Sequence, residues 1–273
     1  MPSLPVSAGA IRKLLRDIRS SESGEHVLAV GGASEHASLL RQQLRRGGAG
    51  LAAVRLGDPE GADAYVHVLS REIRDDDLIL VGRARRARVP VIAVAMGFAE
   101  QTTIPYVPAT DAVWVADGGA FPLQAIAAAI AARLGEHGAP LAARVPLLRR
   151  AVSDQLVASF ARKNGMLAAA VWIPGADLPF LALNELRLVL RLAQAHGASG
   201  DVRERLPELA ATIAAGFGLR AIARELLDSV SGAGWAIKGA VAYGGTRALG
   251  EAARVRYELA PRQQPDGAAR VAP

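Results

Sequence analysis

Hydrophobic residues in the first half of the chain follow two alternating patterns. Short, nearly continuous apolar runs, typical of strands that are covered on both faces, occupy residues 27–30, 51–56, 64–69, 89–94 and 112–116. Between and after these runs, apolar residues recur at helical spacing in residues 35–46, 78–86 and 121–134. Strands that alternate with helices predict an α/β fold, in which a mostly parallel sheet has helices on both faces.

The second half of the chain loses the strand pattern. Its helical patterns cover roughly residues 142–162, 178–195, 205–227 and 234–258, with breaks that contain glycine or proline. We therefore predict an all-α helical domain after the α/β domain. The expected division is an N-terminal amphipathic helix in 1–20, the α/β domain in 21–140, the helical domain in 141–258 and a disordered tail in 259–273.

Composition removes several kinds of chemistry. The 273 residues include no cysteine, so disulfides, thiolate metal sites and cysteine nucleophiles are excluded. The histidines show no metal-ligand spacing and no nucleophile-elbow pattern occurs, so we predict no metal site, no bound cofactor and no catalytic residue. The net charge of +6 is spread over both halves, which argues against a nucleic-acid partner.

One short segment has the layout of a phosphate-binding loop. It runs from a strand through Gly31 and Gly32 into a helix start that contains Ser38. Aligned on G-x-x-x-x-G-K-[ST], Gly31 and Ser38 take the first and last positions, but His36 replaces the second glycine and Ala37 the lysine. The lysine would reach the terminal phosphates, and the glycines let backbone N–H groups surround them. Gly31, Gly32 and Ser38 are therefore expected to form the remnant of a nucleotide site.

Two charged clusters stand at the ends of the helix predicted over residues 78–86. The three aspartates of residues 75–77 precede it, and we expect them to cap the helix, because its dipole stabilises carboxylates at that end. The densest basic cluster of the chain lies at the other end of this helix and consists of Arg83, Arg85, Arg86 and Arg88. We expect these arginines to be solvated, because cations are favourable at a helix C-terminus. The alternative is that they bind a lipid phosphate or an acidic partner.

Three apolar segments of the second half bear on membrane contact. They span residues 166–183, 207–219 and 232–246, and each is short or interrupted. Burial in a soluble core and association with a membrane both stay open. In the last helical segment, small residues recur every four positions, at Ala236, Ala240, Gly244, Ala248 and Ala252. Such a stripe permits two helices to pack closely. We favour packing inside one domain, and the alternative is packing between two copies of the chain.

The second half resembles the YcjF-type domain, a bacterial family of unknown function. The matching stretches lie at residues 177–193, 216–220 and 232–250, and the most specific is G-A-G-W-A-I-K-G-A-V-A-Y-G-G-T-R-A-L-G at 232–250. The resemblance implies an all-helical, often membrane-associated domain with no known catalytic residues. In that family the domain often follows an Era-like GTPase domain.

The first half looks like such a GTPase domain with its motifs lost. Residues 63–69 look like the strand before the switch region, without a D-x-x-G after them. Residues 89–97 look like the strand that ends in N-K-x-D, but Ala95, Met96, Gly97 and Phe98 occupy that region. Together with the altered phosphate loop, these losses predict a P-loop-GTPase-like domain that does not hydrolyse nucleotide.

These observations predict a non-catalytic scaffold or regulatory protein that is associated with a membrane on its cytoplasmic side. The expected partners are a membrane surface, another protein, or a second copy of the chain through the stripe from Ala236 to Ala252. Two alternatives to this prediction stay open. One is a divergent protein that binds GTP or ATP, and the other is a wholly soluble interaction module.

Overall fold

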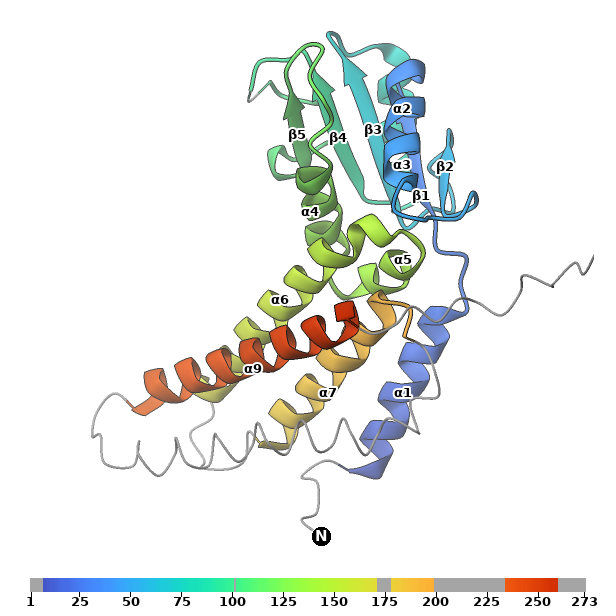
Figure 1. Cartoon of the computed structure of the whole chain (residues 1–273). Helices are drawn as coiled ribbons and strands as arrows, with labels where there is room; N and C mark the ends of the chain where they lie inside the picture. The colour runs from blue at the N-terminus through green and yellow to red at the C-terminus, as the bar shows by residue number, and fades with distance from the viewer. Residues whose placement is uncertain (1–6, 101, 171–177, 199–233, 260–273) are drawn as a thin grey trace, which may run out of the picture.

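The computed structural model describes residues 7–100, 102–170, 178–198 and 234–259. Figure 1 shows a sheet with its helices at one end and a group of long helices at the other. The strands are β1 (Leu28–Gly32), β2 (Val54–Leu56), β3 (Ala64–Ser70), β4 (Val91–Met96) and β5 (Ala112–Val115). The α-helices are α1 (Ala8–Glu22), α2 (Ser34–Arg45), α3 (Asp75–Arg86), α4 (Leu123–Leu134), α5 (Gly138–Arg144), α6 (Arg149–Ala170), α7 (Leu178–Ala195) and α9 (Gly234–Leu259). Short 3-10 helices are η1 (Ala109–Asp111), η2 (Gly135–His137) and η3 (Pro146–Leu148).

The five strands form one parallel sheet in the order β2-β1-β3-β4-β5. In its register, Leu28 of β1 lies beside Val54 of β2 on one side and Ala64 of β3 on the other. This is one of the two common strand orders of doubly wound α/β sheets. The sheet, with helices on both of its faces, confirms the predicted α/β class.

Different structures cover the two faces of the sheet. Helices α2 and α4 cover one face, where Leu40 and Ile126 pack with strand residues such as Val66. On the other face, α3 covers only part of the sheet, and the connection between β4 and β5 covers the rest through Ile104 and Val107. This second face is therefore sealed partly by an irregular segment, and a pocket opens there.

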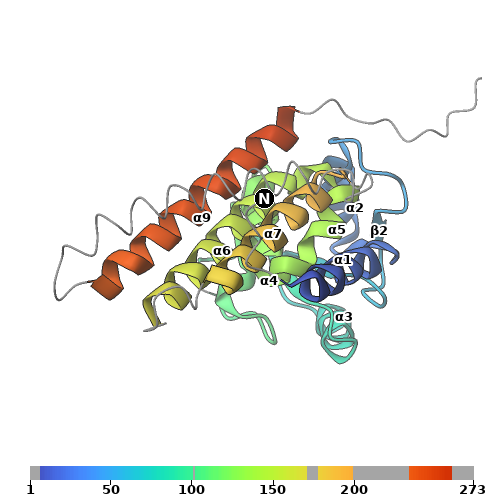
Figure 2. The same cartoon turned by 90° about the horizontal axis from the view of Figure 1, so that it is seen from below.

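The helical part adjoins the sheet through α4. Figures 1 and 2 show α9, α6, α7 and α1 lying next to one another below the sheet. The helix predicted over residues 142–162 is instead two helices, α5 and α6, with η3 between them. Pro146 explains the break, because the residue before a proline disfavours the helical conformation, and α5 ends at Arg144.

Helices α6 and α9 pack closely through glycines. A Cβ atom at Gly239 would lie 3.0 Å from the carbonyl oxygen of Gly165, and a Cβ atom at Gly250 would lie 2.7 Å from a methyl group of Val157. The small-residue stripe is not the face that makes this contact, because its five residues, from Ala236 to Ala252, are all exposed. The interpretation that the stripe packs inside the domain is wrong.

Several sequence features fall outside the described residues: the helix predicted over 205–227, the apolar segment 207–219 and the tail from residue 260. Within the described helices, none has the length and apolar character needed to cross a membrane.

The close packing predicts opposite effects of alanine at two glycines of α9. Gly250→Ala should lower the free energy of unfolding by about 1–3 kcal/mol, because the new methyl group overpacks the contact with Val157. Gly244→Ala is the matched control: nothing lies within 4 Å of its Cβ position, so the higher helix propensity of alanine should raise the free energy of unfolding by about 0.5–1 kcal/mol. Urea unfolding measures both, and equal effects would contradict the packing.

Candidate functional site at the carboxyl edge of the sheet

A pocket of about 470 Å³ lies where β1 and β3 end side by side. In open α/β sheets, ligands bind outside the carboxyl ends of the strands, where the strand order reverses, and for this order that point is between β1 and β3. We call this pocket the switch-point pocket. Its lining residues are Gly32, Ala33, Ser34, Glu35, His36, Val68, Ser70, Glu72, Arg74, Asp76, Asp77 and Leu80.

The two glycines at the end of β1 are required by packing against β3. A Cβ atom at Gly31 would lie 2.3 Å from the hydroxyl oxygen of Tyr65. Gly32 has a φ of +95°, and a Cβ atom there would lie 2.0 Å from the carbonyl oxygen of Val68. Any other residue would push the strands apart. The fold therefore accounts for both glycines without a phosphate group.

The connection from β1 to α2 is too short to surround a phosphate. Strand β1 ends at Gly32 and α2 begins at Ser34, so Ala33 alone lies between them. The N–H of Ala33 donates to the carbonyl oxygen of Val68 over 2.8 Å, so it is not available to a ligand. Ser38 lies in α2, is exposed and does not line the pocket. Of the three predicted residues, Gly32 alone lines the pocket, with Gly31 buried beside it.

The charge of the switch-point pocket is predominantly negative. Glu35, Glu72, Asp76 and Asp77 line it, and the cation Arg74 is paired with Glu72 over 3.1 Å. The N-terminus of α2 would attract an anion through its dipole, but Glu35 already occupies its first turn. Like charges in one pocket repel each other, so the lining disfavours a polyphosphate.

A buried chain of hydrogen bonds lies beneath this pocket. The Tyr65 hydroxyl is 2.9 Å from Nδ1 of His67, and Nε2 of His67 is 2.8 Å from Oδ1 of Asp77. Tyr65 and His67 are both 0% exposed. The other carboxylate oxygen of Asp77 accepts the backbone N–H of Arg74 over 2.9 Å. The chain therefore joins β3 to the first turn of α3.

The raised pKa of Tyr65 and the hydrogen-bond geometry together fit one arrangement of protons along the Tyr65–His67–Asp77 series. Burial, with the nearby charges of Asp77 and Asp58, raises the pKa of Tyr65 far above its usual range, so the phenol keeps its proton and donates to Nδ1 of His67. Nε2 then carries the ring proton and donates to Asp77. Burial alone would raise the pKa of Asp77, but the hydrogen bonds from His67 and Arg74 outweigh it and lower that pKa.

This chain of hydrogen bonds connects β3 with α3, and most of it lies below the pocket. Its far end, the Tyr65 hydroxyl, faces Gly31 inside the protein, and only Asp77 reaches the pocket lining. The prediction that the aspartates cap α3 is confirmed for Asp77. The role of His67 was not predicted. Tyr65 and His67 are two positions apart on a predicted strand, so the sequence indicates that they share one face of the sheet. The sequence does not indicate the carboxylate that His67 contacts, because Asp77 follows ten positions later on a helix.

A D-x-x-G pattern is present one strand earlier than expected. It is Asp58-Pro59-Glu60-Gly61, which follows β2 and precedes β3, whereas the motif was expected after β3. The Asp58 carboxylate accepts the N–H of Glu60 over 2.8 Å and pairs with Arg83. It does not line the switch-point pocket. No D-x-x-G follows residues 63–69, and Asp58 of the pattern after β2 is engaged away from the pocket.

Neither a family model, nor a curated protein, nor a solved structure matches this chain. The resemblances to a YcjF-type domain and to an Era-like GTPase domain therefore stay predictions. Within the described residues, no group of three potential ligands is placed to hold a metal ion.

Substitution of Asp77 tests the buried chain. Asp77→Asn should lower the free energy of unfolding at pH 7 by about 1–3 kcal/mol, because it weakens charge-assisted hydrogen bonds from His67 and Arg74. The lowered pKa of Asp77 adds stability above its unfolded pKa, near 3.8, that is lost as the pH falls through the folded value. The difference between the wild type and the variant should therefore begin to shrink as the pH falls below 3.8 and vanish only below the lowered pKa of folded Asp77.

The matched control is Asp75→Asn, on the same helical turn but exposed. It should change the free energy of unfolding by less than about 0.5 kcal/mol. Equal effects of the two variants at pH 7, in urea unfolding followed by circular dichroism, would contradict the assigned role of Asp77.

Proposed function

We propose that this protein is a non-catalytic scaffold or regulatory protein that binds peripherally to an anionic membrane surface. The membrane contact is made by the end of the helical part farthest from the sheet. The α/β part then extends away from the membrane and is held in a defined orientation for a protein partner.

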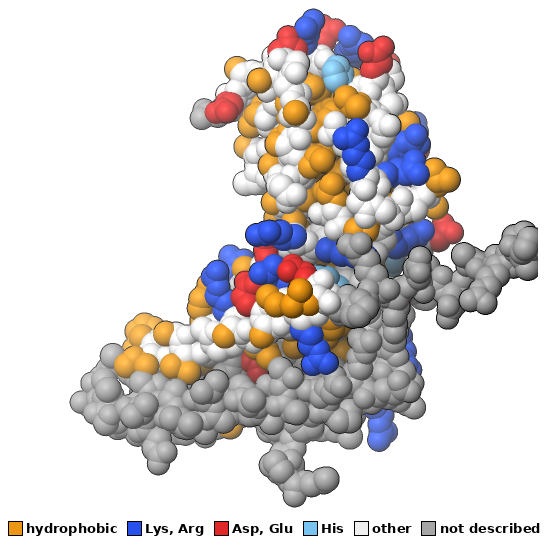
Figure 3. All heavy atoms as spheres, in the orientation of Figure 1, with side chains coloured by type: hydrophobic (Ala, Val, Ile, Leu, Met, Phe, Trp, Pro, Cys, Tyr) orange, Lys and Arg blue, Asp and Glu red, His pale blue; other side chains and the backbone are white. Residues whose placement is uncertain are grey.

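The observation that carries this proposal is a group of exposed apolar side chains at that far end. Met166, Phe180 and Trp235 are 65%, 60% and 64% exposed. They belong to three different helices, near the C-terminus of α6 and at the N-termini of α7 and α9. The three helices pack together near these positions, where Ala168, Leu181 and Ala242, the last about two turns into α9, form one buried cluster. Figure 3 shows hydrophobic side chains gathered at the free end of α9. Large apolar residues exposed together mark an interaction surface.

Cations stand at the same end of the molecule. The hydroxyl of Ser21, late in α1, accepts a hydrogen bond of 2.8 Å from Arg191, late in α7. Since α1 and α7 run in the same direction (Figure 1), their N-termini lie at the same end. The first turns of α1 carry the exposed residues Arg12, Lys13 and Arg16. Exposed cations and exposed apolar side chains at one end of a molecule are the combination that binds anionic lipid head groups.

The α/β part supports a non-catalytic role. Its switch-point pocket has acidic residues and a one-residue connection where a nucleotide site needs a loop and a lysine. The hydrogen-bonded chain below it ends on a phenol that is 0% exposed. These features fit a scaffold better than an enzyme.

Sedimentation with lipid vesicles tests the membrane contact. The protein should pellet with vesicles that contain phosphatidylserine and much less with phosphatidylcholine alone, and salt should weaken the binding. Replacing Met166, Phe180 and Trp235 together by serine should reduce the affinity at least about tenfold, because their burial in the interface is lost.

A double variant of Leu51→Ser and Ile79→Ser is the matched control. These residues are equally apolar and are 75% and 53% exposed, but they lie in the α/β part. The control should bind like the wild type. Failure of the wild type to pellet, or equal loss in both variants, would overturn the proposal.

The second candidate is a divergent nucleotide-binding protein. It is favoured by the position of the pocket between β1 and β3 and by the D-x-x-G after β2. Our account expects no binding of GTP or ATP with Mg²⁺ tighter than about 10 μM in calorimetry, which is roughly −7 kcal/mol. Tighter binding would replace the scaffold proposal with this one.

A further inference from the structure

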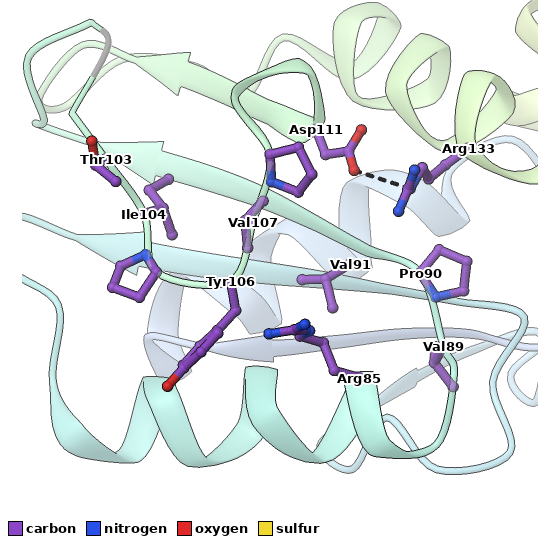
Figure 4. A pocket seen from close by; sticks show the side chains of 12 residues that line it. Arg85, Val89, Pro90, Val91, Thr103, Ile104, Tyr106, Val107, Asp111 and Arg133 are labelled. Atoms are coloured by element: carbon purple, nitrogen blue, oxygen red, sulfur yellow. Dashed lines mark ion pairs between the residues drawn. The ribbon is translucent and has the colours of Figure 1, made fainter.

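A second pocket, of about 510 Å³, opens on the face of the sheet that α3 covers only in part. It lies between the end of α3, the start of β4 and the connection that leads to β5. Figure 4 shows Arg85 reaching from α3 into this space, toward Tyr106 on the connection. We call it the Arg85 pocket. It is separate from the switch-point pocket, with which it shares no lining residue.

The guanidinium of Arg85 is oriented but unneutralised. It lies 5.1 Å from the centre of the Tyr106 ring, in a cation–π contact. Within the described part of the chain, the side chain of Arg85 has no hydrogen bond or ion pair with another residue, whereas its neighbour Arg83 is paired with Asp58. A planar cation stacked on a ring keeps its N–H groups free for a carboxylate or phosphate group.

Tyr106 is held in a backbone conformation that costs free energy. Its φ is +67°, and the N–H of Val107 donates to the carbonyl oxygen of Ile104 across the turn. A proline at the second position and a positive φ at the third are features of a type II turn, where the third residue is usually glycine or asparagine. A tyrosine there costs about 1–2 kcal/mol. Tyr106 is 59% exposed, so burial of its side chain offsets little of this cost.

The rest of the pocket is apolar with one balanced ion pair. Val91, Ile104 and Val107 are buried residues of the lining. Arg133 also lines the pocket, and its Nε lies 3.0 Å from the buried carboxylate of Asp111 (Figure 4), so this pair adds no net charge. The lining thus has one uncompensated cation above an apolar floor. Such a lining complements a small organic anion that has a charged group at one end and an apolar body at the other.

We propose that the Arg85 pocket binds a small organic anion, whose carboxylate or phosphate group pairs with the Arg85 guanidinium that Tyr106 orients and whose apolar body lies over Val91. This site is independent of the membrane contact. Its ligand class excludes inorganic phosphate as a good ligand, because phosphate has no body to bury.

Titrations with phenyl phosphate, benzoate and inorganic phosphate, followed by ¹H–¹⁵N NMR, test the proposal. Phenyl phosphate or benzoate should bind with a Kd of about 1 mM or tighter and shift the amide signals of Val91, Ile104 and Tyr106, and inorganic phosphate should bind at least about tenfold more weakly. The first two ligands also distinguish a phosphate from a carboxylate preference. No saturable shifts with either aryl ligand would overturn the proposal.

Two arginines on α3 provide a matched pair of variants. Arg85→Gln should weaken binding of the better aryl ligand about tenfold or more. Arg86→Gln removes the same charge from the adjacent position, which does not line the pocket, and should leave the affinity within about twofold. Equal losses in both variants would show general charge attraction and overturn the assignment.

Tyr106→Asn separates binding from folding. Asparagine tolerates a positive φ, so the thermal midpoint should stay equal or rise, while the affinity for the aryl ligand falls about fivefold or more. A variant that binds as tightly as the wild type would remove Tyr106 from the site, and one that unfolds at a clearly lower temperature would show that the residue serves stability instead.

Discussion

One apolar core, continuous from the sheet into the helical part, is the constraint on which the rest of the structure depends. Helix α4 makes the junction: its side chains Ile126, Ile130 and Leu134 are buried, and the helix contacts β4 and β5 as well as α6. The same cluster of buried residues contains Val30 of β1 and Leu249 of α9. The sheet and the helical part therefore cannot separate without exposing apolar surface to water. This shared core fixes the direction in which the long helices extend from the sheet.

Glycine has two structural uses in this fold, and neither needs a ligand. At the end of β1, Gly31 makes room for the hydroxyl of Tyr65, which in turn anchors His67 and the start of α3. In the helical part, Gly239 and Gly250 let α9 approach α6. A glycine pair after a buried strand is thus compatible with a phosphate loop and equally with close strand packing. The length of the connection that follows distinguishes the two, and here it is one residue.

Much of the fold could be predicted because its signals are local. Uninterrupted apolar runs gave the strands, and the helix predicted over 178–195 has the same bounds as α7. The functional site depends on distances between segments, which the sequence does not display. The exposed position of the stripe from Ala236 to Ala252 depends on the rotation of α9 against α6, set by Gly239 and Gly250. Likewise, the stacking of Arg85 on Tyr106 joins a helix end to a distant turn, and a basic cluster alone could not reveal it.

The central claim is that the far end of the helical part faces a membrane. Because the chain has no cysteine, one introduced residue can be labelled with an environment-sensitive fluorophore. Ala236→Cys, beside Trp235, and Ala87→Cys, at the end of α3 among the arginines, are both exposed positions. On addition of vesicles that contain phosphatidylserine, the account predicts a blue shift for the label at position 236 and none at position 87. A shift at position 87 alone, or at neither position while the protein is bound, would contradict it.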